Sequence, residues 1–350
     1  EEYGLIVLRN MAVKCVGIVL LFLFIRTKND LLLYVALTAA TGLLGNISMW
    51  GYLKGQVEKP VLKELRPLRH LKETLVYFIP TIATSVYTIL DKTMLGWFSG
   101  ENKSQNGYYE YATGFVNMAK ILIMSFNAVM SARMSYLFGT GRMEEIHKRF
   151  QDSLDFVLLM AMPIMLGLAG IAAQFIPWFL GNGYLPVTFL MYVCSPLVLV
   201  VGLSDCIGSQ ILTPGGKRAQ SGKVIVAGAM VNACLNFLLI PHFAALGAAA
   251  ASVAAECFIT SLYLWLGRDF IKLKMLVRYG WRRLVAAVIM LGAVVWTGQF
   301  LEQVRGLGPI TTFIQIGAGA MVYFLVLLVM RDPFLYQYLG KIYRRLTGQP

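Results

Sequence analysis

The chain has 350 residues, of which 57% are hydrophobic and only 14% charged, whereas a water-soluble domain carries about 25% charged residues. This composition excludes a soluble globule and a disordered chain, and it predicts a protein that lies in a lipid bilayer. The net charge of +13 would suit nucleic acid only if a soluble domain presented it. We find no such domain in the sequence and expect no nucleic acid among the partners.

Ten stretches of the chain are apolar over the roughly 20 residues that a helix needs to cross the hydrocarbon core. They cover residues 10–25, 31–52, 71–97, 108–135, 153–177, 184–212, 220–240, 243–266, 281–301 and 309–330. The sequence therefore predicts an all-α polytopic membrane protein with about ten transmembrane helices. Glu1 is not a methionine and an apolar stretch follows it closely, so we expect further helices before it.

Basic residues are unevenly shared between the loops that join these stretches. Alternate loops hold 23 of the 31 basic residues, and the loops between them hold only Arg26, Lys28, Lys103 and Arg305. Lys and Arg accumulate in cytoplasmic loops, so the rich set is predicted to be cytoplasmic. Two of these segments, 57–72 and 268–283, mix apolar with basic residues, and each is either a headgroup-lying segment or a solvated linker.

The usual signatures of an enzyme or an ATP-driven pump are missing. Residues 216–224 resemble a phosphate-binding loop, but they have one residue too many between the glycines and Val224 where Ser or Thr should hold magnesium. The five cysteines fall inside apolar stretches, and the three histidines are scattered over loops. We therefore expect no catalytic residues, no metal and no resident cofactor.

Polar residues form a stripe along the stretch 71–97. They recur at steps of three and four, and so share one helix face: Thr81, Thr84, Ser85, Thr88, Asp91 and Lys92. An ionisable side chain near mid-bilayer costs about 2.5–3.5 kcal/mol to insert, so each one needs a partner or water. This face is therefore predicted to meet protein or a wet cavity.

Other apolar stretches also contain polar residues at helical spacing. The polar positions are Thr113, Asn117, Lys120, Asn127 and Ser131 in one stretch, Ser252, Glu256 and Thr260 in another, Asn232 and Asn236 in a third, and Asp205 between Gly202 and Gly208. Two interpretations remain open. These residues either hold helices together, with Lys120 and Glu256 as an ion pair, or line a cavity through which a polar cargo passes.

One segment carries a family resemblance. It reads FIPTIATSVYTILDKTMLG at 78–96, followed by GYYE at 107–110 and RMS at 133–135. This pattern resembles the oligosaccharide flippases of bacterial polysaccharide biosynthesis (Wzx type). The long interval before Lys120 and the pair Ser131-Ala132 before Arg133 depart from the family pattern.

The resemblance implies a MATE-like fold of the multidrug/oligosaccharidyl-lipid/polysaccharide exporter superfamily, in which two six-helix lobes face each other across a cavity. Residues 1–60 would be the last two helices of an incomplete N-terminal lobe. Residues 71–266 would form the C-terminal six-helix lobe, and 267–350 two additional transmembrane helices with a basic cytoplasmic tail. Four helices would then precede Glu1.

The resemblance also implies a function. A secondary transporter, not an enzyme, would move an undecaprenyl-pyrophosphate-linked oligosaccharide across the bacterial cytoplasmic membrane for capsule, exopolysaccharide or O-antigen synthesis. Alternating access would be driven by membrane potential or by an ion gradient, with H⁺ or Na⁺ as the coupling ion. Expected partners are the lipid-linked oligosaccharide, membrane lipids and the polysaccharide polymerase machinery.

Within this hypothesis the charged residues divide into two groups. The groups assigned to the pyrophosphate and sugars are Lys92, Lys120, Arg133, Asn117 and Asn127. The groups assigned to the coupling ion are Asp91, Glu256, Asp205 and Glu110. A buried cation attracts a diphosphate more strongly than one in water, and protonation of a buried carboxylate would bias one orientation of the cavity.

Three alternatives stay open. A multidrug/cation antiporter of the same fold would have an acidic, aromatic-lined cavity for cationic substrates. An integral-membrane glycosyltransferase or acyltransferase would gather Asp, Glu or His at one interface. A non-transporting scaffold would leave the polar stripes packed without water.

Overall fold

The computed structural model describes residues 3–53, 71–98, 104–271 and 273–337, together with Gly100 and Gly340. Every regular element in these ranges is helical, which confirms the predicted all-α class. The chain divides into two compact units, Glu1–His70 and Leu71–Pro350. The predicted segment 57–70 and the basic tail after Gly340 lie outside the described residues.

The first unit is a helical hairpin of α1 (Tyr3–Phe24) and α2 (Leu31–Leu53). A short helical turn, η1 (Lys28–Asp30), joins them. The Asp30 carboxylate accepts hydrogen bonds from the backbone N–H groups of Arg26 at 3.0 Å and Thr27 at 2.8 Å. These two donors hold the pKa of Asp30 below its usual value and satisfy amides that would otherwise be exposed where the chain reverses.

The second unit contains the remaining helices. They are α3 (Leu71–Phe98), α4 (Ser104–Gly139), α5 (Met143–Phe179), α6 (Leu185–Cys194), α7 (Leu197–Ile207), α8 (Arg218–Leu266), α9 (Leu273–Arg305) and α10 (Pro309–Val329). Six described helices are long and apolar enough to cross a membrane, or seven if a bent pair counts as one span. Each of the ten predicted stretches coincides with a helix, a bent pair of helices or half of a kinked helix. Because only six or seven of the described helices are long and apolar enough to cross a membrane, the predicted count of ten spans is approximate.

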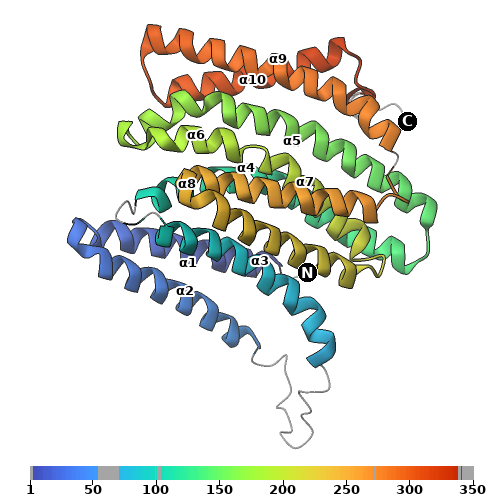
Figure 1. Cartoon of the computed structure of the whole chain (residues 1–350), viewed down its shortest axis with the longest axis horizontal. Helices are drawn as coiled ribbons and strands as arrows, with labels where there is room; N and C mark the ends of the chain where they lie inside the picture. The colour runs from blue at the N-terminus through green and yellow to red at the C-terminus, as the bar shows by residue number, and fades with distance from the viewer. Residues whose placement is uncertain are drawn as a thin grey trace, which may run out of the picture. The chain divides into compact units, whose positions relative to one another are not determined.

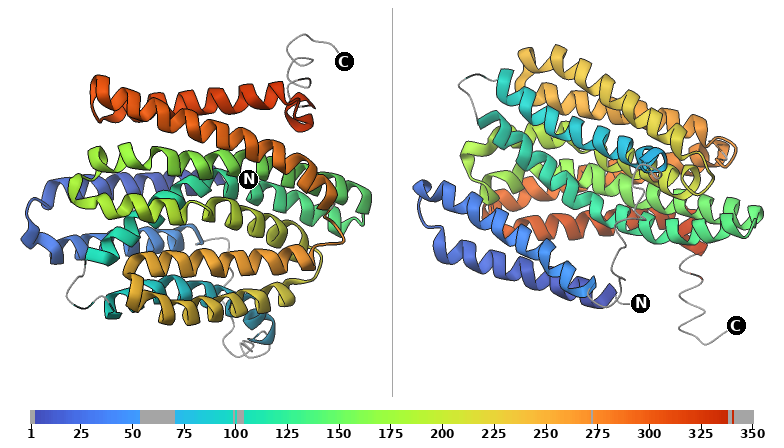
Figure 2. Two further views of the ribbon diagram at one scale, coloured as in Figure 1. Left: turned by 45° about the horizontal axis from the view of Figure 1, so that its top comes forward. Right: turned by 90° about the horizontal axis from the view of Figure 1, so that it is seen from below.

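Helix α8 is two helices separated by a kink. Ala244 has φ 47° and ψ −125°, which no helix tolerates, and Pro241 removes a backbone donor just before it. Beyond the kink, a Cβ on Gly247 would lie 2.5 Å from the Leu239 carbonyl oxygen, so only glycine lets the second half pass so close to the first. The two halves correspond to the predicted stretches 220–240 and 243–266. Figure 2 shows them folded back on each other beside α3.

The predicted stretch 184–212 is a broken span. Helices α6 and α7 meet at an angle of 42° around Pro196, and α7 continues into a single π-helical turn, η4 (Gly208–Leu212). A proline lacks the N–H that would continue the α6 ladder, and π turns are frequent at functional sites. Asp205 lies in the last turn of α7, shortly before this turn.

Helices α9 and α10 form an antiparallel pair that packs on α5 (Figure 1). Their buried seam consists of Met290, Val294, Tyr323 and Leu327. Large apolar side chains on the outer faces, such as Phe313 and Val329, are mostly exposed. That distribution suits helices whose outer surface meets acyl chains.

The burial of Arg283 departs from the prediction for the segment 268–283, in which the side chains of 272–279 lie outside the described part of the structure. The segment was expected to lie along headgroups or in solvent, but α9 begins at Leu273 and the Arg283 side chain is 0% exposed. Its guanidinium bonds the Asp155 carboxylate at 2.9 Å and the Asp332 carboxylate at 3.2 Å. The hydrophobic pattern did not predict the burial of Arg283, because the sequence alone does not show that two carboxylates from distant parts of the chain contact its guanidinium.

Candidate functional site

Six of the nine predicted site residues surround one cavity in the second unit. The cavity measures about 170 Å³ and lies between the end of α3, the first half of α4, α7 and the second half of α8. We call it the Lys120 cavity. The predicted residues that line it are Asp91, Lys92, Glu110, Asn117, Lys120 and Glu256. The side chains of Thr81, Thr84 and Thr88 lie outside the described part of the structure.

Asp91 is the most enclosed of these groups, with 2% of its surface exposed. Its carboxylate accepts hydrogen bonds from Tyr109 at 2.9 Å, from Ser252 at 2.7 Å and from the Asn236 amide at 2.5 Å. Asn236 also donates to Asn232 at 3.0 Å. Three neutral donors from two other helices offset the loss of water around the charge, as a buried carboxylate requires.

The partners of Asp91 were only partly visible in the sequence. Asn232, Asn236 and Ser252 stand out as polar residues in apolar stretches, but their convergence on Asp91 depends on the kink of α8. Tyr109 belongs to the segment GYYE that carries the family resemblance, but its contact with Asp91 had no signal in the sequence, because a tyrosine at the end of a membrane span is ordinarily an interfacial residue.

Lys92 and Glu110 form an ion pair at the rim of the cavity. Their charged atoms are 2.5 Å apart, and the side chains are 47% and 59% exposed. The pair joins the end of α3 to the start of α4. An exposed pair of this kind contributes little stability, so its partners can exchange readily.

Lys120 and Glu256 lie deeper in the same cavity. Both are partly buried, and their opposite charges attract one another. Asn117, one turn before Lys120 on α4, faces the cavity beside them. Lys120 on α4 and Glu256 on α8 therefore line one cavity with opposite charges.

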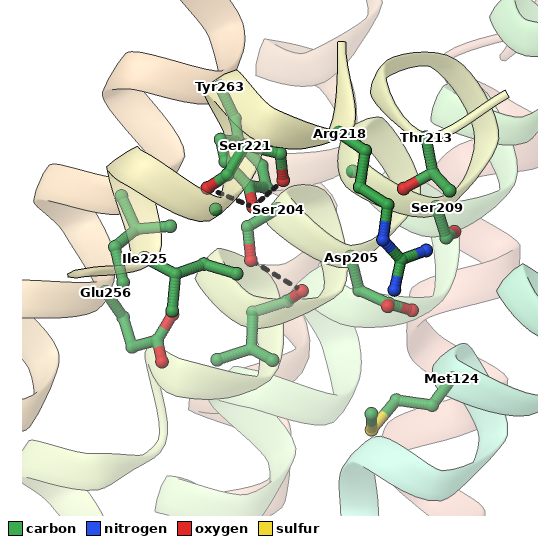
Figure 3. Close-up of a pocket in the computed structure, with 14 residues that line it drawn as sticks. Met124, Ser204, Asp205, Ser209, Thr213, Arg218, Ser221, Ile225, Glu256 and Tyr263 are labelled. Carbon is green, nitrogen blue, oxygen red and sulfur yellow. Dashed lines mark hydrogen bonds between the residues drawn. The ribbon is translucent and has the colours of Figure 1, made fainter. Parts of the chain in front are cut away.

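A second, larger cavity adjoins the first. It measures about 340 Å³, and we call it the Asp205 cavity (Figure 3). Its charged residues are Asp205, Arg218 and Glu256, and the Arg218 guanidinium points toward the Asp205 carboxylate. Sequence analysis counted Arg218 among the basic loop residues. The available clue to this arrangement was that Arg218 closely follows the span that contains Asp205.

Asn127 holds Asp205 in place. Its amide donates to the Asp205 carboxylate at 2.9 Å and to the Gly202 carbonyl at 3.2 Å. Gln210, on the π-helical turn, donates to the Asn127 side chain at 3.1 Å. Asn127 is fully buried and lines neither cavity, so in this conformation it positions a carboxylate and does not face a cargo.

Arg133 lies away from both cavities. It is exposed near the end of α4, where it donates to Glu145 at 3.2 Å and lies over the Tyr136 ring. Glu145 is also within ion-pair distance of Arg142 and Arg149. The structure thus does not bring Arg133 together with Lys92 and Lys120.

No group of three or more metal-ligating side chains that could hold a metal ion occurs among the described residues. The two cavities instead offer carboxylates, ammonium groups, a guanidinium and hydroxyls. Such an arrangement can bind ions and exchange protons.

The chain is similar in sequence to proteins of polysaccharide biosynthesis and O-antigen transport. A family profile described as "Polysaccharide biosynthesis protein" matches residues 1–137. The "Putative O-antigen transporter" of Escherichia coli K12 is 24% identical over 77% of this chain and 65% of its own length. The protein of the same name from Shigella dysenteriae is 22% identical over 75% of this chain and 66% of its own length. The chain thus spans about two thirds of these relatives.

A solved structure has the same fold. The lipid II flippase MurJ, in an inward closed conformation, matches with a TM-score of 0.64 and 18% identity, over 87% of this chain and 64% of its own. The family profile covers residues 78–135, which carry the predicted resemblance, and the likeness to MurJ shows that the two chains share a helical fold. The chain is a multi-pass membrane protein that resembles the Wzx-type flippases of polysaccharide biosynthesis and shares the fold of the lipid II flippase.

Proposed function

We propose that this protein moves a lipid-linked oligosaccharide with an anionic pyrophosphate group from one leaflet of the bacterial cytoplasmic membrane to the other. The observation that carries the proposal is the Lys120 cavity, which holds Lys92 and Lys120 in a chain that resembles O-antigen transporters. Lys presents a compact point charge, which binds a phosphate without the rigid fork of Arg and so releases it more readily.

The charges in the cavity support an exchange of partners. Lys92 pairs with Glu110, and Lys120 is attracted to Glu256. A diphosphate that enters the cavity competes with these two carboxylates for the ammonium groups. This competition keeps the affinity moderate, and a transporter needs that because it must also release its cargo.

We further propose that a coupling cation, H⁺ or Na⁺, drives the cycle at the carboxylates. Asp91 suits this role because it is buried and surrounded by neutral oxygen- and nitrogen-bearing groups. The Asn236 amide oxygen beside it is buried and has no hydrogen-bond partner among the described residues. A cation bound at Asp91 would neutralise the buried charge and shift the balance between two orientations of the cavity.

The orientation and the partners follow from the same proposal. The loops rich in Lys and Arg lie in the cytoplasm, and the Lys120 cavity, at the end of α3, then faces the outer side. The polysaccharide polymerase machinery would receive the flipped product. An antiporter of cationic drugs has less support, because the relatives are named for O-antigen.

Vesicle reconstitution tests the proposal. The probe is a fluorescent undecaprenyl-pyrophosphate-linked trisaccharide, and its exposure on the outer leaflet is followed by a membrane-impermeant quencher. Lys92→Ala and Lys120→Ala should each slow the exchange between leaflets, since each removes a charge that the diphosphate binds. Lys148→Ala, which removes an exposed lysine on α5, is the matched control. Equal exchange in all four proteins would refute the proposal.

A further inference from the structure

Glu256 lines both cavities. The residues common to the Lys120 cavity and the Asp205 cavity are Val201 and Glu256. Val201 is apolar and cannot exchange a proton. Glu256 is therefore the ionisable group at the junction, on the second half of α8.

The two cavities lie toward opposite ends of the membrane span. The Lys120 cavity is built from the end of α3 and the start of α4, on either side of a loop that is poor in basic residues. The Asp205 cavity includes Thr213 and Arg218, which flank the loop containing Lys217. By the distribution of basic residues, one cavity approaches the outer side and the other the cytoplasm.

Charged and titratable groups face Glu256 from each side. In the Lys120 cavity they are Lys120, Asp91, Lys92, Glu110 and Tyr109, from α3 and α4. In the Asp205 cavity they are Asp205 on α7, and Arg218 and Tyr263 on α8. Glu256 thus lies between a cavity with two ammonium groups and two further carboxylates on one side and a cavity with a carboxylate and a guanidinium on the other.

Hydroxyl groups extend the polar path away from Glu256 in both directions. Ser252, one helical turn before Glu256, donates to Asp91. On the other side, Ser204, Ser209, Thr213 and Ser221 line the Asp205 cavity. The Ser209 hydroxyl has no hydrogen-bond partner among the described residues. A hydroxyl both donates and accepts, so a chain of hydroxyls and water can pass a proton, whereas Na⁺ needs several oxygen ligands at one point.

We propose that Glu256 passes protons between the two cavities, so that the coupling path of the proposed transporter runs through this unit. The Glu256 carboxylate takes a proton from water in one cavity, becomes a neutral acid, and releases the proton to water in the other. While Glu256 is neutral, Lys120 loses its counter-charge and is available to the anionic cargo. This inference rests on the proposed function for its role in coupling, but the path itself does not depend on the cargo.

Proton entry into vesicles measures the path. The protein is reconstituted with a trapped pH-sensitive dye, and a potassium gradient with valinomycin sets an inside-negative potential. Glu256→Gln and Asp205→Asn should reduce protein-dependent proton entry by on the order of tenfold or more, equivalent to about 1.4 kcal/mol in the barrier. Glu302→Gln on α9, which lines neither cavity, is the matched control and should behave as the wild type. Wild-type proton entry in Glu256→Gln would overturn the inference.

A second measurement does not depend on how well a variant folds. In the wild-type protein, dicyclohexylcarbodiimide should label Glu256, and mass spectrometry should show the labelling falling as the pH is raised, because the reagent requires a protonated carboxyl group. Absence of labelling, or labelling independent of pH, would contradict the inference.

The lipid probe in the same vesicles separates this inference from the proposed function. Glu256-dependent proton entry without any probe exchange in the wild type would refute the flippase and retain the path. Probe exchange in the wild type, together with proton entry that does not depend on Glu256, would refute the proton path and retain the flippase.

Discussion

Replacing Arg283 should destabilise the second unit more than any exposed arginine does. The guanidinium is fully buried, and it donates to Asp155 on α5 and to Asp332 after α10. Asp332 also accepts the backbone N–H groups of Phe334 and Leu335, which fixes the start of the following turn. Arg283→Ala would leave one wholly buried and one mostly buried carboxylate without their counter-charge.

The magnitude follows from the cost of such orphaned charges. Breaking a buried ion pair from one side costs roughly 3–5 kcal/mol, which corresponds to a drop in melting temperature on the order of 10 °C for a unit of this size. Thermal unfolding of the detergent-solubilised protein, followed by tryptophan fluorescence, measures the shift. Arg282→Ala is the control, because the neighbouring Arg282 makes one longer bond, 3.3 Å, to the Arg331 carbonyl. Equal shifts for both variants would refute the assignment of Arg283 as a buried clamp.

Three further predictions concern the kink, the cavity and the buried carboxylate. Gly247→Ala should destabilise the second unit by about 1–3 kcal/mol in the same melting assay, because the new Cβ would clash with backbone atoms. Gly292→Ala on α9 is the control, because its new Cβ would meet open space and the substitution should be neutral or stabilising. The reverse order would be inconsistent with the kink geometry. Asn117→Cys should react with a water-soluble maleimide and the fully buried Asn127→Cys should not, and equal labelling would contradict the cavity wall. Asp91→Leu should abolish coupled transport, since it removes the acceptor of three hydrogen bonds; normal gradient-driven exchange would exclude Asp91 as a coupling group.

The sequence predicted the helices well because transmembrane spans are encoded locally. About 20 consecutive apolar residues specify a span whatever surrounds it, and the ten stretches correspond to helices, a bent pair of helices or halves of a kinked helix. The kink at Ala244 could also be anticipated from Pro241 and the glycine that follows. The π-helical turn after Asp205 could not, because its residues, Gly208–Leu212, are compatible with an ordinary helix.

The clustering of charged residues around one cavity was foreshadowed where polarity in an apolar helix is itself the signal. Asp91, Lys120 and Glu256 stood out for that reason, and all three line one cavity. Arg133 and Asn127 also stood out in the sequence. However, Arg133 is exposed and bonds Glu145, and Asn127 is buried and donates to Asp205. Helical periodicity predicts the face of the helix on which a residue lies, but it does not predict which other helix packs against that face.

In the proposed function, the ammonium group of Lys120 binds an anionic cargo in competition with Glu256. Binding of undecaprenyl pyrophosphate to the protein in lipid nanodiscs measures this competition, with Lys120→Ala, Glu256→Gln and the control Lys148→Ala compared to the wild type. Loss of a charged hydrogen bond worth about 1.5–3 kcal/mol should weaken binding of the Lys120→Ala variant roughly 10- to 150-fold, while Glu256→Gln should bind more tightly than the wild type. Unchanged affinity in Lys120→Ala, or weaker binding in both cavity variants, would contradict the claim.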